Sequence, residues 1–527
     1  MKNALLLLMI SSLTITGFSQ ITFQKIYGGV LNSQGSCVRQ TNDGGYIIVG
    51  NTASYGAGNK DVYLIKTNNY GDTLWSKTYG GINGDEGSEV QQTTDGGYII
   101  VGVTASFGAG GNDVYLIKTD SIGDTLWSKT YGNTFYDAGT SIKQTTDGGY
   151  IIIGYTLNSS NYYSHVIIIK TNSIGDTMFT KILHVNNFDA GNSIEQTIDG
   201  GYIIVGYTGD NPPEHVYLIK LKPDMDTAWT KIYSGANMDF GNSVQQTTDG
   251  GYIIAGGTNS FGAGGNDIYL IKIDSIGDTL FTKTYGGTGD DEASSVKQTS
   301  DGGYIISGIT NSFGSGGYDI YLVKTDSLGD TLWTRTFGGT GDDIAYSVQQ
   351  TNDTGYIIVG YTYSFGGSYP KIYLIKTDSF GNVTQGCYQH NTETIVGSTT
   401  TQVGRPNTIV SSGAIVTSPQ TIIGGGDMVT TICFTTGIDE VKTIDNVIVY
   451  PNPNNGNFEV VYSGLANHNS QFIIKDVLGR SVYTNNLINN TEGTQTIDVS
   501  GLNNGVYYWE MLTNKGIEGS GKIAVIK

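Results

Sequence analysis

Residues 88–132 read SEVQQTTDGGYIIVGVTASFGAGGNDVYLIKTDSIGDTLWSKTYG, and this stretch contains four strand signals separated by turns. The Asp-Gly pair at 95–96 favours a tight hairpin, because its central residues take positive φ. Residues 98–103 and 113–119 are almost continuously apolar, which is typical of strands covered on both faces. A polar TDSIGD turn then leads into a fourth, alternating strand. The segment therefore predicts a four-stranded antiparallel unit.

The unit recurs seven times along the chain, with a period of 52 residues that shortens once to 50. The marker DGGY, or its variant DTGY, begins at Asp43, Asp95, Asp147, Asp199, Asp249, Asp301 and Asp353. Four strands in about fifty residues match one blade of a β-propeller. We therefore predict an all-β chain whose residues 20–385 form a seven-bladed β-propeller.

Closure of the ring has a signal of its own. The seventh copy stops after its third strand, at residues 371–378, and then loses the TLW pattern. The missing strand matches ITFQKIYGG at residues 21–29, where Phe23 lies 52 residues before Trp75. The N-terminal strand is thus expected to complete the last blade and to remove an exposed sheet edge.

The N-terminal segment predicts export. Residues 1–19 carry one lysine, a short apolar run and small residues, which is typical of a secretory signal peptide. The apolar run is too short to span a bilayer, and no later segment resembles a transmembrane helix. A net charge of −19 argues against nucleic acid as a partner. We expect a secreted monomer.

Three cysteines divide into two kinds. Cys387 and Cys433 flank a segment rich in Thr, Ser, Gly and Val, and they are predicted to form a disulfide in an oxidising compartment. Residues 386–436 are accordingly expected to form a small β linker module, followed by an acidic hinge at 437–445. Cys37 replaces a residue that is serine in most other repeats, and we expect a buried free thiol there.

Residues 446–527 carry a series of ordered motifs: VIVYPNPNNGNFEV, IIKDVLGRSVY, DVSGLNNGVYYWEM and a terminal GKIAVIK. The marker residues are Tyr450, Pro451, Asn452, Pro453, Gly456, Gly479, Leu502, Gly505 and Tyr507. This segment closely resembles the type A C-terminal sorting domain of the type IX secretion system of Bacteroidetes. The resemblance implies a Greek-key β-sandwich, recognition by the type IX secretion machinery, export across the outer membrane and removal of the tail. The repeats also resemble those of secreted Bacteroidetes propeller proteins.

The longer loops, between strands two and three and between blades, share one face, which is the expected site of binding. An aromatic residue opens many of these loops: Tyr55, Phe107, Phe261, Phe313 and Phe365. Such rings can stack on sugars, but packing against a neighbouring blade is the favoured interpretation. Tyr162, Tyr163 and His165 break the loop pattern in the third blade, so they mark either a specific site or tolerated drift.

An aspartate also recurs on this face, at Asp85, Asp137, Asp189, Asp239, Asp291 and Asp343. We favour hydrogen bonding of each carboxylate to the backbone of its own loop. The exceptions that we weigh as calcium ligands are Asp290, Asp291, Glu292, Asp342 and Asp343, although none matches an EF-hand loop. No other cofactor is expected.

Catalytic signals are weak. The chain has no HExxH zinc motif and no GxSxG elbow. The propeller has only Arg39 and Arg335, which excludes the arginine triad of sialidases. We therefore predict a secreted or cell-surface binding or adhesion module for glycan or protein that is not an enzyme. The alternatives are a polysaccharide hydrolase or lyase, with His165, His215, Asp210 and Glu214 as non-repeating candidates, and a structural surface protein.

Overall fold

The computed structural model describes residues 20–157, 163–210 and 213–383, short segments between 387 and 435, and most of 447–525. The predicted signal peptide, the predicted hinge and Tyr162 lie outside the described residues. The chain forms two compact units, one of which spans Gln20–Thr436 and the other of which contains Gly437–Lys527. Each unit is described by itself. In the described part of the chain, no helix is long and apolar enough to cross a membrane.

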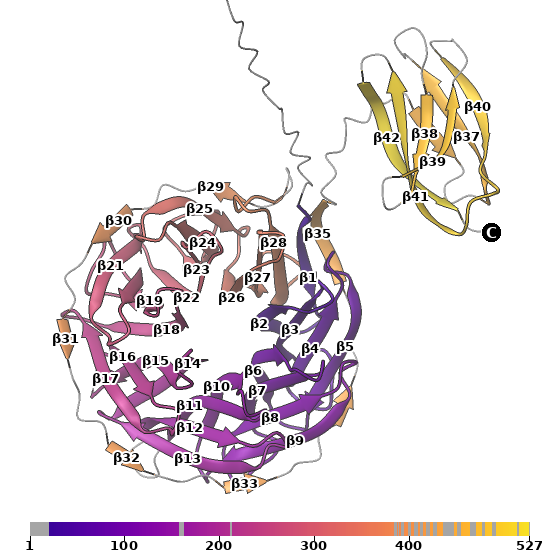
Figure 1. Cartoon of the computed structure of the whole chain (residues 1–527). Helices are drawn as coiled ribbons and strands as arrows, with labels where there is room; N and C mark the ends of the chain where they lie inside the picture. Colours follow the sequence, from indigo (N-terminus) through magenta and orange to yellow (C-terminus); the bar gives the residue numbers. More distant parts are fainter. Residues whose placement is uncertain are drawn as a thin grey trace, which may run out of the picture. The chain divides into compact units, whose positions relative to one another are not determined.

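Each sequence repeat folds as a group of antiparallel strands, and Figure 1 shows these groups arranged around an axis like the blades of a propeller. Repeats 1 to 4 contain β2 (Ser33–Gln40), β3 (Tyr46–Thr52), β4 (Asp61–Thr67) and β5 (Thr73–Gly80); β6 (Asp85–Gln92), β7 (Tyr98–Thr104), β8 (Asp113–Thr119) and β9 (Thr125–Gly132); β10 (Asp137–Gln144), β11 (Tyr150–Leu157), β12 (Ser164–Thr171) and β13 (Thr177–His184); β14 (Phe188–Gln196), β15 (Tyr202–Gly209), β16 (His215–Leu221) and β17 (Thr227–Ser234). Repeats 5 to 7 contain β18 (Asp239–Gln246), β19 (Tyr252–Thr258), β20 (Asp267–Ile273) and β21 (Thr279–Gly286); β22 (Asp291–Gln298), β23 (Tyr304–Thr310), β24 (Asp319–Thr325) and β25 (Thr331–Phe337); β26 (Asp343–Gln350), β27 (Tyr356–Thr362) and β28 (Lys371–Thr377).

The N-terminal strand β1 (Thr22–Tyr27) pairs antiparallel with β28, and Phe23 lies opposite Lys376. The seventh group therefore obtains its fourth strand from the other end of the chain, which confirms the pairing that the sequence predicts. The first strand of each group, such as β2, β6 and β10, lies innermost in the ring (Figure 1).

The core lies between neighbouring groups. One buried cluster joins Ile47 and Leu64 of repeat 1 to Val90 and Tyr98 of repeat 2, and similar clusters follow around the ring. Each large side chain buried in this way contributes about 1.5–3 kcal/mol. The fourth-strand tyrosines add a polar link: the Tyr79 hydroxyl donates to the Gly123 carbonyl of the next repeat at 2.6 Å.

The described strands between residues 390 and 435 belong to the ring, which corrects the prediction of a separate β linker module over 386–436. These short strands pair one after another with the outermost strands of the ring, in reverse order along the chain (Figure 1). We name these strands the belt. They are β29 (His390–Asn391) on β25, β30 (Ile395–Ser398) on β21, β31 (Gln402–Gly404) on β17, β32 (Ile409–Ser411) on β13, β33 (Ile415–Thr417) on β9, β34 (Ile422–Gly424) on β5 and β35 (Val429–Thr435) on β1. The physical reason is that each outermost strand offers unpaired N–H and C=O groups, which the belt satisfies.

The other unit contains two antiparallel sheets that share one core. One sheet is β36 (Val447–Tyr450), β37 (Asn457–Ser463) and β40 (Glu492–Asp498); the other is β39 (Ser481–Asn486), β38 (Gln471–Lys475), β41 (Gly505–Thr513) and β42 (Gly516–Val525). Phe458, Phe472 and Trp509 are central to the core, and Leu502 and Tyr507 pack against it. Tyr450 ends β36, Gly456 has φ of +102°, and Gly505 begins β41. Pro451, Asn452, Pro453 and Gly479 lie outside the described residues.

Candidate ligand site in the central channel

At the tight-turn end of the ring, the repeated lysines and aspartates pair with each other. Each third-strand lysine is buried and contacts the aspartate of the DGG or DTG turn in its own repeat, at 2.8–2.9 Å. Burial alone would raise the pKa of Asp43, but hydrogen bonds from Thr41 and Lys66 hold it at about 2. The pairs are Lys66–Asp43, Lys118–Asp95, Lys170–Asp147, Lys220–Asp199, Lys272–Asp249, Lys324–Asp301 and Lys376–Asp353. These repeated ion pairs therefore belong to the structural framework of the ring.

The aromatic residues that open the long loops pack inward. Each ring lies against the third-strand tyrosine of its own repeat, with centroids 5.6–5.8 Å apart. The pairs are Tyr55–Tyr63, Phe107–Tyr115, Phe261–Tyr269, Phe313–Tyr321 and Phe365–Tyr373. Packing therefore explains why an aromatic residue recurs at this position of the loop.

The repeated loop aspartates accept backbone N–H groups, as the favoured interpretation holds. Asp85 Oδ2 accepts from Gly81 at 2.8 Å, and Asp343 Oδ2 accepts from Gly339 at 2.9 Å. The same bond is made by Asp137, Asp189, Asp239 and Asp291.

The acidic residues weighed as calcium ligands have protein partners. Asp290 Oδ1 accepts the Asn266 N–H at 2.9 Å, and Glu292 accepts the Asn266 amide at 2.6 Å. Asp342 Oδ1 accepts the Tyr318 N–H at 3.0 Å. Within the described residues, no group of three or more His, Cys, Asp or Glu side chains is placed to hold a metal ion.

The irregular third repeat is tightly packed where it is described. Tyr163 makes an edge contact with Phe188 at 5.7 Å, and the His165 ring lies 4.4 Å from that of His184. Burial, and then the neighbouring His184, lowers the pKa of His165. His165 is therefore a largely buried neutral imidazole, and not an open ligand site.

The residues that break the repeat most strongly lie in the central channel. A β-bulge in each innermost strand separates the third aligned position from the fifth, so that the fifth and seventh positions line the channel. Five charged residues stand at these positions, where other repeats have mostly serine or glutamine. They are Arg39, Glu89, Lys143, Glu195 and Lys297, with a net charge of +1.

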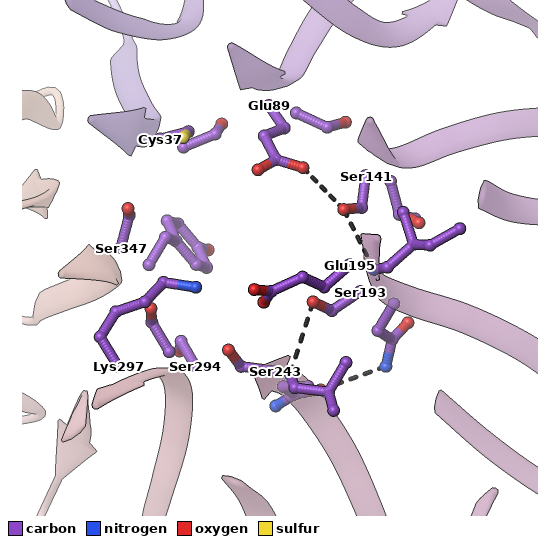
Figure 2. Close-up of a pocket in the computed structure, with 18 of the residues that line it drawn as sticks. Cys37, Glu89, Ser141, Ser193, Glu195, Ser243, Ser294, Lys297 and Ser347 are labelled. Atoms are coloured by element: carbon purple, nitrogen blue, oxygen red, sulfur yellow. Dashed lines mark hydrogen bonds between the residues drawn. The ribbon is translucent and has the colours of Figure 1, made fainter. Parts of the chain in front are cut away.

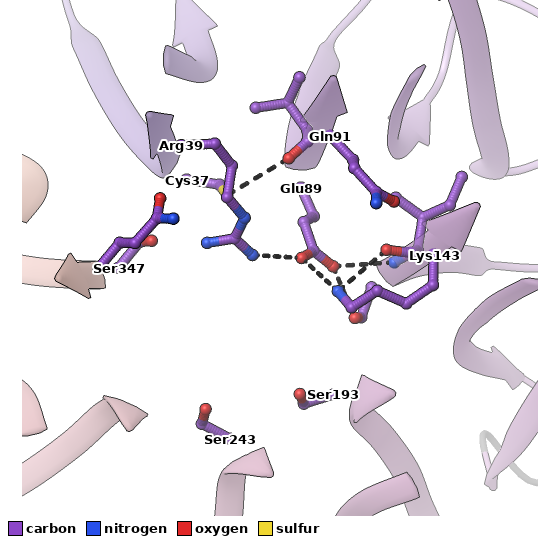
Figure 3. Close-up of polar contacts among 12 residues, drawn as sticks. Cys37, Arg39, Glu89, Gln91, Lys143, Ser193, Ser243 and Ser347 are labelled. Carbon is purple, nitrogen blue, oxygen red and sulfur yellow. Dashed lines mark hydrogen bonds and ion pairs between the residues drawn. The ribbon is translucent and has the colours of Figure 1, made fainter. Parts of the chain in front are cut away.

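Glu89 is the most strongly held of these groups (Figure 3). Its Oε1 lies 2.5 Å from Arg39 and 2.7 Å from Lys143, and its Oε2 accepts the Ser141 hydroxyl at 2.6 Å. Burial would raise the pKa of Glu89, but Lys143 and Arg39 outweigh burial and hold it well below its usual range. The Ile142 N–H also donates to Oε2 at 2.9 Å, and the aligned Ser243 accepts the Val296 N–H in the same way. Glu89 thus replaces the repeated serine link with an ion-pair cluster.

Glu195 and Lys297 project into the remaining space (Figure 2). They line a cavity of about 120 Å³ together with Ser141, Ser193 and Ser243. Neither has a direct hydrogen-bond or ion-pair partner in the described part of the chain. Burial, and then Arg39, lowers the pKa of Lys297 to about 8, whereas burial raises the pKa of Glu195. These groups are available to a polar ligand.

A wider mouth adjoins this charged section. A cavity of about 360 Å³ is lined by Ser36, Ser88, Asn242, Ser294 and Tyr346, and all five also line the charged section. We name Tyr346, Tyr361 and Tyr363 the tyrosine cluster, because successive rings lie 5.9 Å apart. Tyr346 and Tyr363 are 42% and 46% exposed.

Sequence reasoning missed this site. The fourth, fifth and seventh aligned positions of the innermost strand carry the signal, because their residue types change in some repeats, whereas the third, sixth and eighth positions keep Gly or Ala, Val or Ile, and Gln. Cys37, which lines the same channel, is a buried free thiol. Cys387 is disulfide-bonded.

Comparison with solved structures gives weak likenesses to a protein of Chaetomium thermophilum. Sqt1 bound to the N-terminus of the ribosomal protein L10 has a TM-score of 0.38 and 10% identity, over 63% of this chain and 84% of that chain. A structure of Sqt1 itself has a TM-score of 0.38 and 11% identity, over 63% and 82%. No curated protein matches the chain.

The C-terminal unit has a family match. Residues 448–526 match the model of the secretion system C-terminal sorting domain. The match covers the segment with the ordered motifs and both described sheets of this unit. The chain therefore carries a type IX sorting domain, which indicates export to the cell surface or to the outside of the cell.

Proposed function

We propose that the chain is a secreted or surface-displayed binding module, not an enzyme, which takes a glycan with an acidic group into the mouth and channel of the ring. In this proposal the ring is a seven-bladed propeller closed by β1. The C-terminal sheets form a Greek-key β-sandwich, which the type IX machinery of a Bacteroidetes cell removes after export. The mature protein acts as a monomer, without a cofactor.

One observation carries the proposal: the residues that break the repeat converge on the channel. The repeated lysines are paired, and the repeated loop aromatics are packed. By contrast, Glu195 and Lys297 face a cavity, and Tyr346 lines both the cavity and the mouth. A regular scaffold with irregular residues at one concave place is the usual arrangement of a binding site.

The chemistry of the mouth suits a sugar. Tyr346 offers a ring that is 42% exposed, while Ser36, Ser88 and Asn242 offer hydroxyl and amide groups. A cavity of about 360 Å³ falls within the size range of small-molecule sites. Below it, three cations against two carboxylates favour a ligand whose acidic group reaches down to Lys297.

The experiment is a glycan array probed with the full chain, with uronic-acid and neutral glycans printed side by side. We expect Tyr346→Ala to weaken binding of the selected glycan about tenfold or more, because its ring would lose the stacking contact. Tyr369→Ala is the matched control, since Tyr369 is 46% exposed, close to the 42% of Tyr346, but lines neither cavity. Equal binding by the two variants would contradict the proposed site.

A polysaccharide lyase or hydrolase is the second candidate. The specific observation in its favour is that Glu195 and Lys297, whose pKa values are displaced toward neutrality, line one cavity. Incubation of the full chain with the bound glycan distinguishes the two functions. Release of shorter or unsaturated products that Glu195→Gln abolishes would establish the enzyme and overturn the binding module.

A further inference from the structure

Two buried aspartates, one from repeat 1 and one from repeat 2, meet at the long-loop end of the ring. Asp61 and Asp85 are 1% and 0% exposed. Asp61 Oδ1 and Asp85 Oδ2 lie 2.2 Å and 2.6 Å from the point where a side chain on Gly80 would begin, so the two carboxyl groups are neighbours. Asp113 of repeat 2 and Asp137 of repeat 3 have the same arrangement, at 2.1 Å and 2.8 Å from that point on Gly132. We name these the carboxyl pairs.

The hydrogen bonds of the first pair leave one oxygen on each carboxyl group without a partner. Asp61 Oδ2 accepts the N–H groups of Ala57 and Gly58 at 3.1 Å and 3.2 Å. Asp85 Oδ2 accepts the Gly81 N–H at 2.8 Å and the Ser106 hydroxyl at 2.7 Å. Asp61 Oδ1 and Asp85 Oδ1 are buried and have no donor among the described residues, as is also true of Asp113 Oδ1.

No cation compensates the pairs within the described residues. Lys60 lies beside the first pair in sequence, but its ammonium contacts Glu86 at 3.2 Å, and Asn112 stands at the aligned place in repeat 2. At the tight-turn end, by contrast, every DGG or DTG aspartate has its own lysine. Two adjacent buried carboxyl groups cannot both ionise at low cost, so one positive charge is missing from each pair.

In three other repeats a basic residue stands at the place of Asp61. His165 and His215 replace Asp61 in repeats 3 and 4, and their Nδ1 atoms lie 4.0 Å and 3.9 Å from Asp189 and Asp239. In repeat 7 the aligned residue is Lys371, and its partner position is Ser33. None of these three repeats therefore places two carboxyl groups side by side at this position. Two further carboxyl pairs, Asp267–Asp291 and Asp319–Asp343, repeat the first arrangement around Gly286 and Gly338.

We infer that Asp61 and Asp113 each hold one proton at mildly acidic pH and donate it to Asp85 and Asp137, so that each carboxyl pair is a buried one-proton site. A metal ion with its oxygen ligands needs more room than the closely approaching backbone of Gly80 leaves. A proton needs none, and it would give Asp61 Oδ1 and Asp113 Oδ1, which otherwise have no partner among the described residues, a hydrogen bond to the neighbouring carboxyl group.

The ionisation of these groups agrees with the geometry. Burial, and then the neighbouring aspartate, raises the pKa of Asp61 and of Asp113 to about 6. Because the pKa in the folded chain lies above the ordinary value of about 3.9, folding takes up protons between these two pH values. The stabilising contribution is complete below the lower value and is lost as the pH rises through about 6.

The test is thermal unfolding of the full chain at pH 5 and pH 7.5, for wild type and for the double variant Asp61→Asn, Asp113→Asn. Asparagine keeps an oxygen for Ala57 and Gly58 and places a permanent donor beside Asp85. We expect the wild-type melting temperature to be several degrees lower at pH 7.5. The double variant should melt higher than wild type at pH 7.5 and lose about half of the pH difference, because two of four such pairs remain.

Two controls keep the outcomes decisive. Asp43→Asn, Asp95→Asn removes partners of Lys66 and Lys118, and it should lower the melting temperature equally at both pH values. If the double variant instead keeps the full wild-type pH difference, the proton sites are refuted. If millimolar calcium chloride raises the melting temperature of wild type at pH 7.5 but not that of the double variant, the pairs bind a metal ion and the inference is also overturned.

Discussion

The tight-turn end of the ring and its central channel use charge in opposite ways. At the tight-turn end, seven lysines meet seven aspartates in the same geometry, and each lysine stem is buried. In the channel, five charged residues occur once each, and two of them have no direct partner among the described residues. The difference teaches that repetition in this chain marks structure, whereas departure from the repeat marks the place available for a ligand. Changes in the two regions should therefore have separable effects.

The largest expected effect is on the packing between repeats. Tyr79→Ala should lower the free energy of unfolding by about 3–5 kcal/mol, because it leaves a cavity in a buried cluster. Tyr79→Phe should cost only about 1 kcal/mol, the value of the lost hydrogen bond to Gly123. Urea denaturation of the full chain measures both. Similar losses for the two variants would mean that the hydroxyl, and not the ring, holds the repeats together.

The next effect concerns the belt. Cys387 is disulfide-bonded, and we propose Cys433, at the other end of the belt, as its partner. A bond between them would close the belt around the ring, and Cys387→Ser should then lower the free energy of unfolding by about 2–4 kcal/mol. Peptide mapping without reduction identifies the partner. A free Cys433 thiol in the oxidised protein would contradict the closed belt.

A smaller loss is expected from the Lys–Asp pairs. Lys66→Met should cost about 1–2 kcal/mol, less than a fully buried ion pair, because the Asp43 side chain is more than half exposed. Glycan affinity of the folded protein should stay the same, since the pair lies outside the channel. Denaturation and binding measured on the same preparation test this separation.

Lys297→Met should weaken glycan binding without lowering the stability of the fold. It removes a half-buried cation without a direct partner among the described residues, so the free energy of unfolding should be unchanged or slightly higher. Affinity for an acidic glycan should fall about tenfold, while affinity for a neutral glycan should be nearly unaffected. A variant that unfolds more easily and still binds would place Lys297 in the scaffold.

The smallest predicted effect is a pH dependence of binding. Because the pKa of Lys297 is about 8, the ammonium that attracts an acidic ligand is lost as the pH rises through that value. Affinity should decline severalfold between pH 7 and pH 9. Lys297→Arg is the control, since a guanidinium stays charged over this range and should abolish the decline.

The ring can be predicted from the sequence because each group of strands is encoded by a repeat of residues that are close together in the chain. The Asp-Gly turns, the apolar strands and the match of Phe23 to Trp75 are enough to place β1 beside β28. The belt could not be predicted, because strands such as β31 have three residues and their partners are far away in sequence. Short Thr- and Val-rich segments carry no signal for which edge they will cover.

The channel escaped prediction for a related reason. Glu89 is visible in the sequence as a departure from serine, but its partners Arg39 and Lys143 lie 50 and 54 residues away. Only the return of each innermost strand to the same axis brings the three together. Alignment of the repeats by position, followed by a search for columns in which charge changes, would have found them.

The most direct test of the central claim is the affinity of the full chain for the array-selected glycan, compared between Tyr346→Ala and Tyr369→Ala by calorimetry. We expect a loss of about tenfold or more for Tyr346→Ala and wild-type affinity for Tyr369→Ala, with equal melting temperatures. Wild-type affinity in Tyr346→Ala would show that the channel mouth is not the binding site.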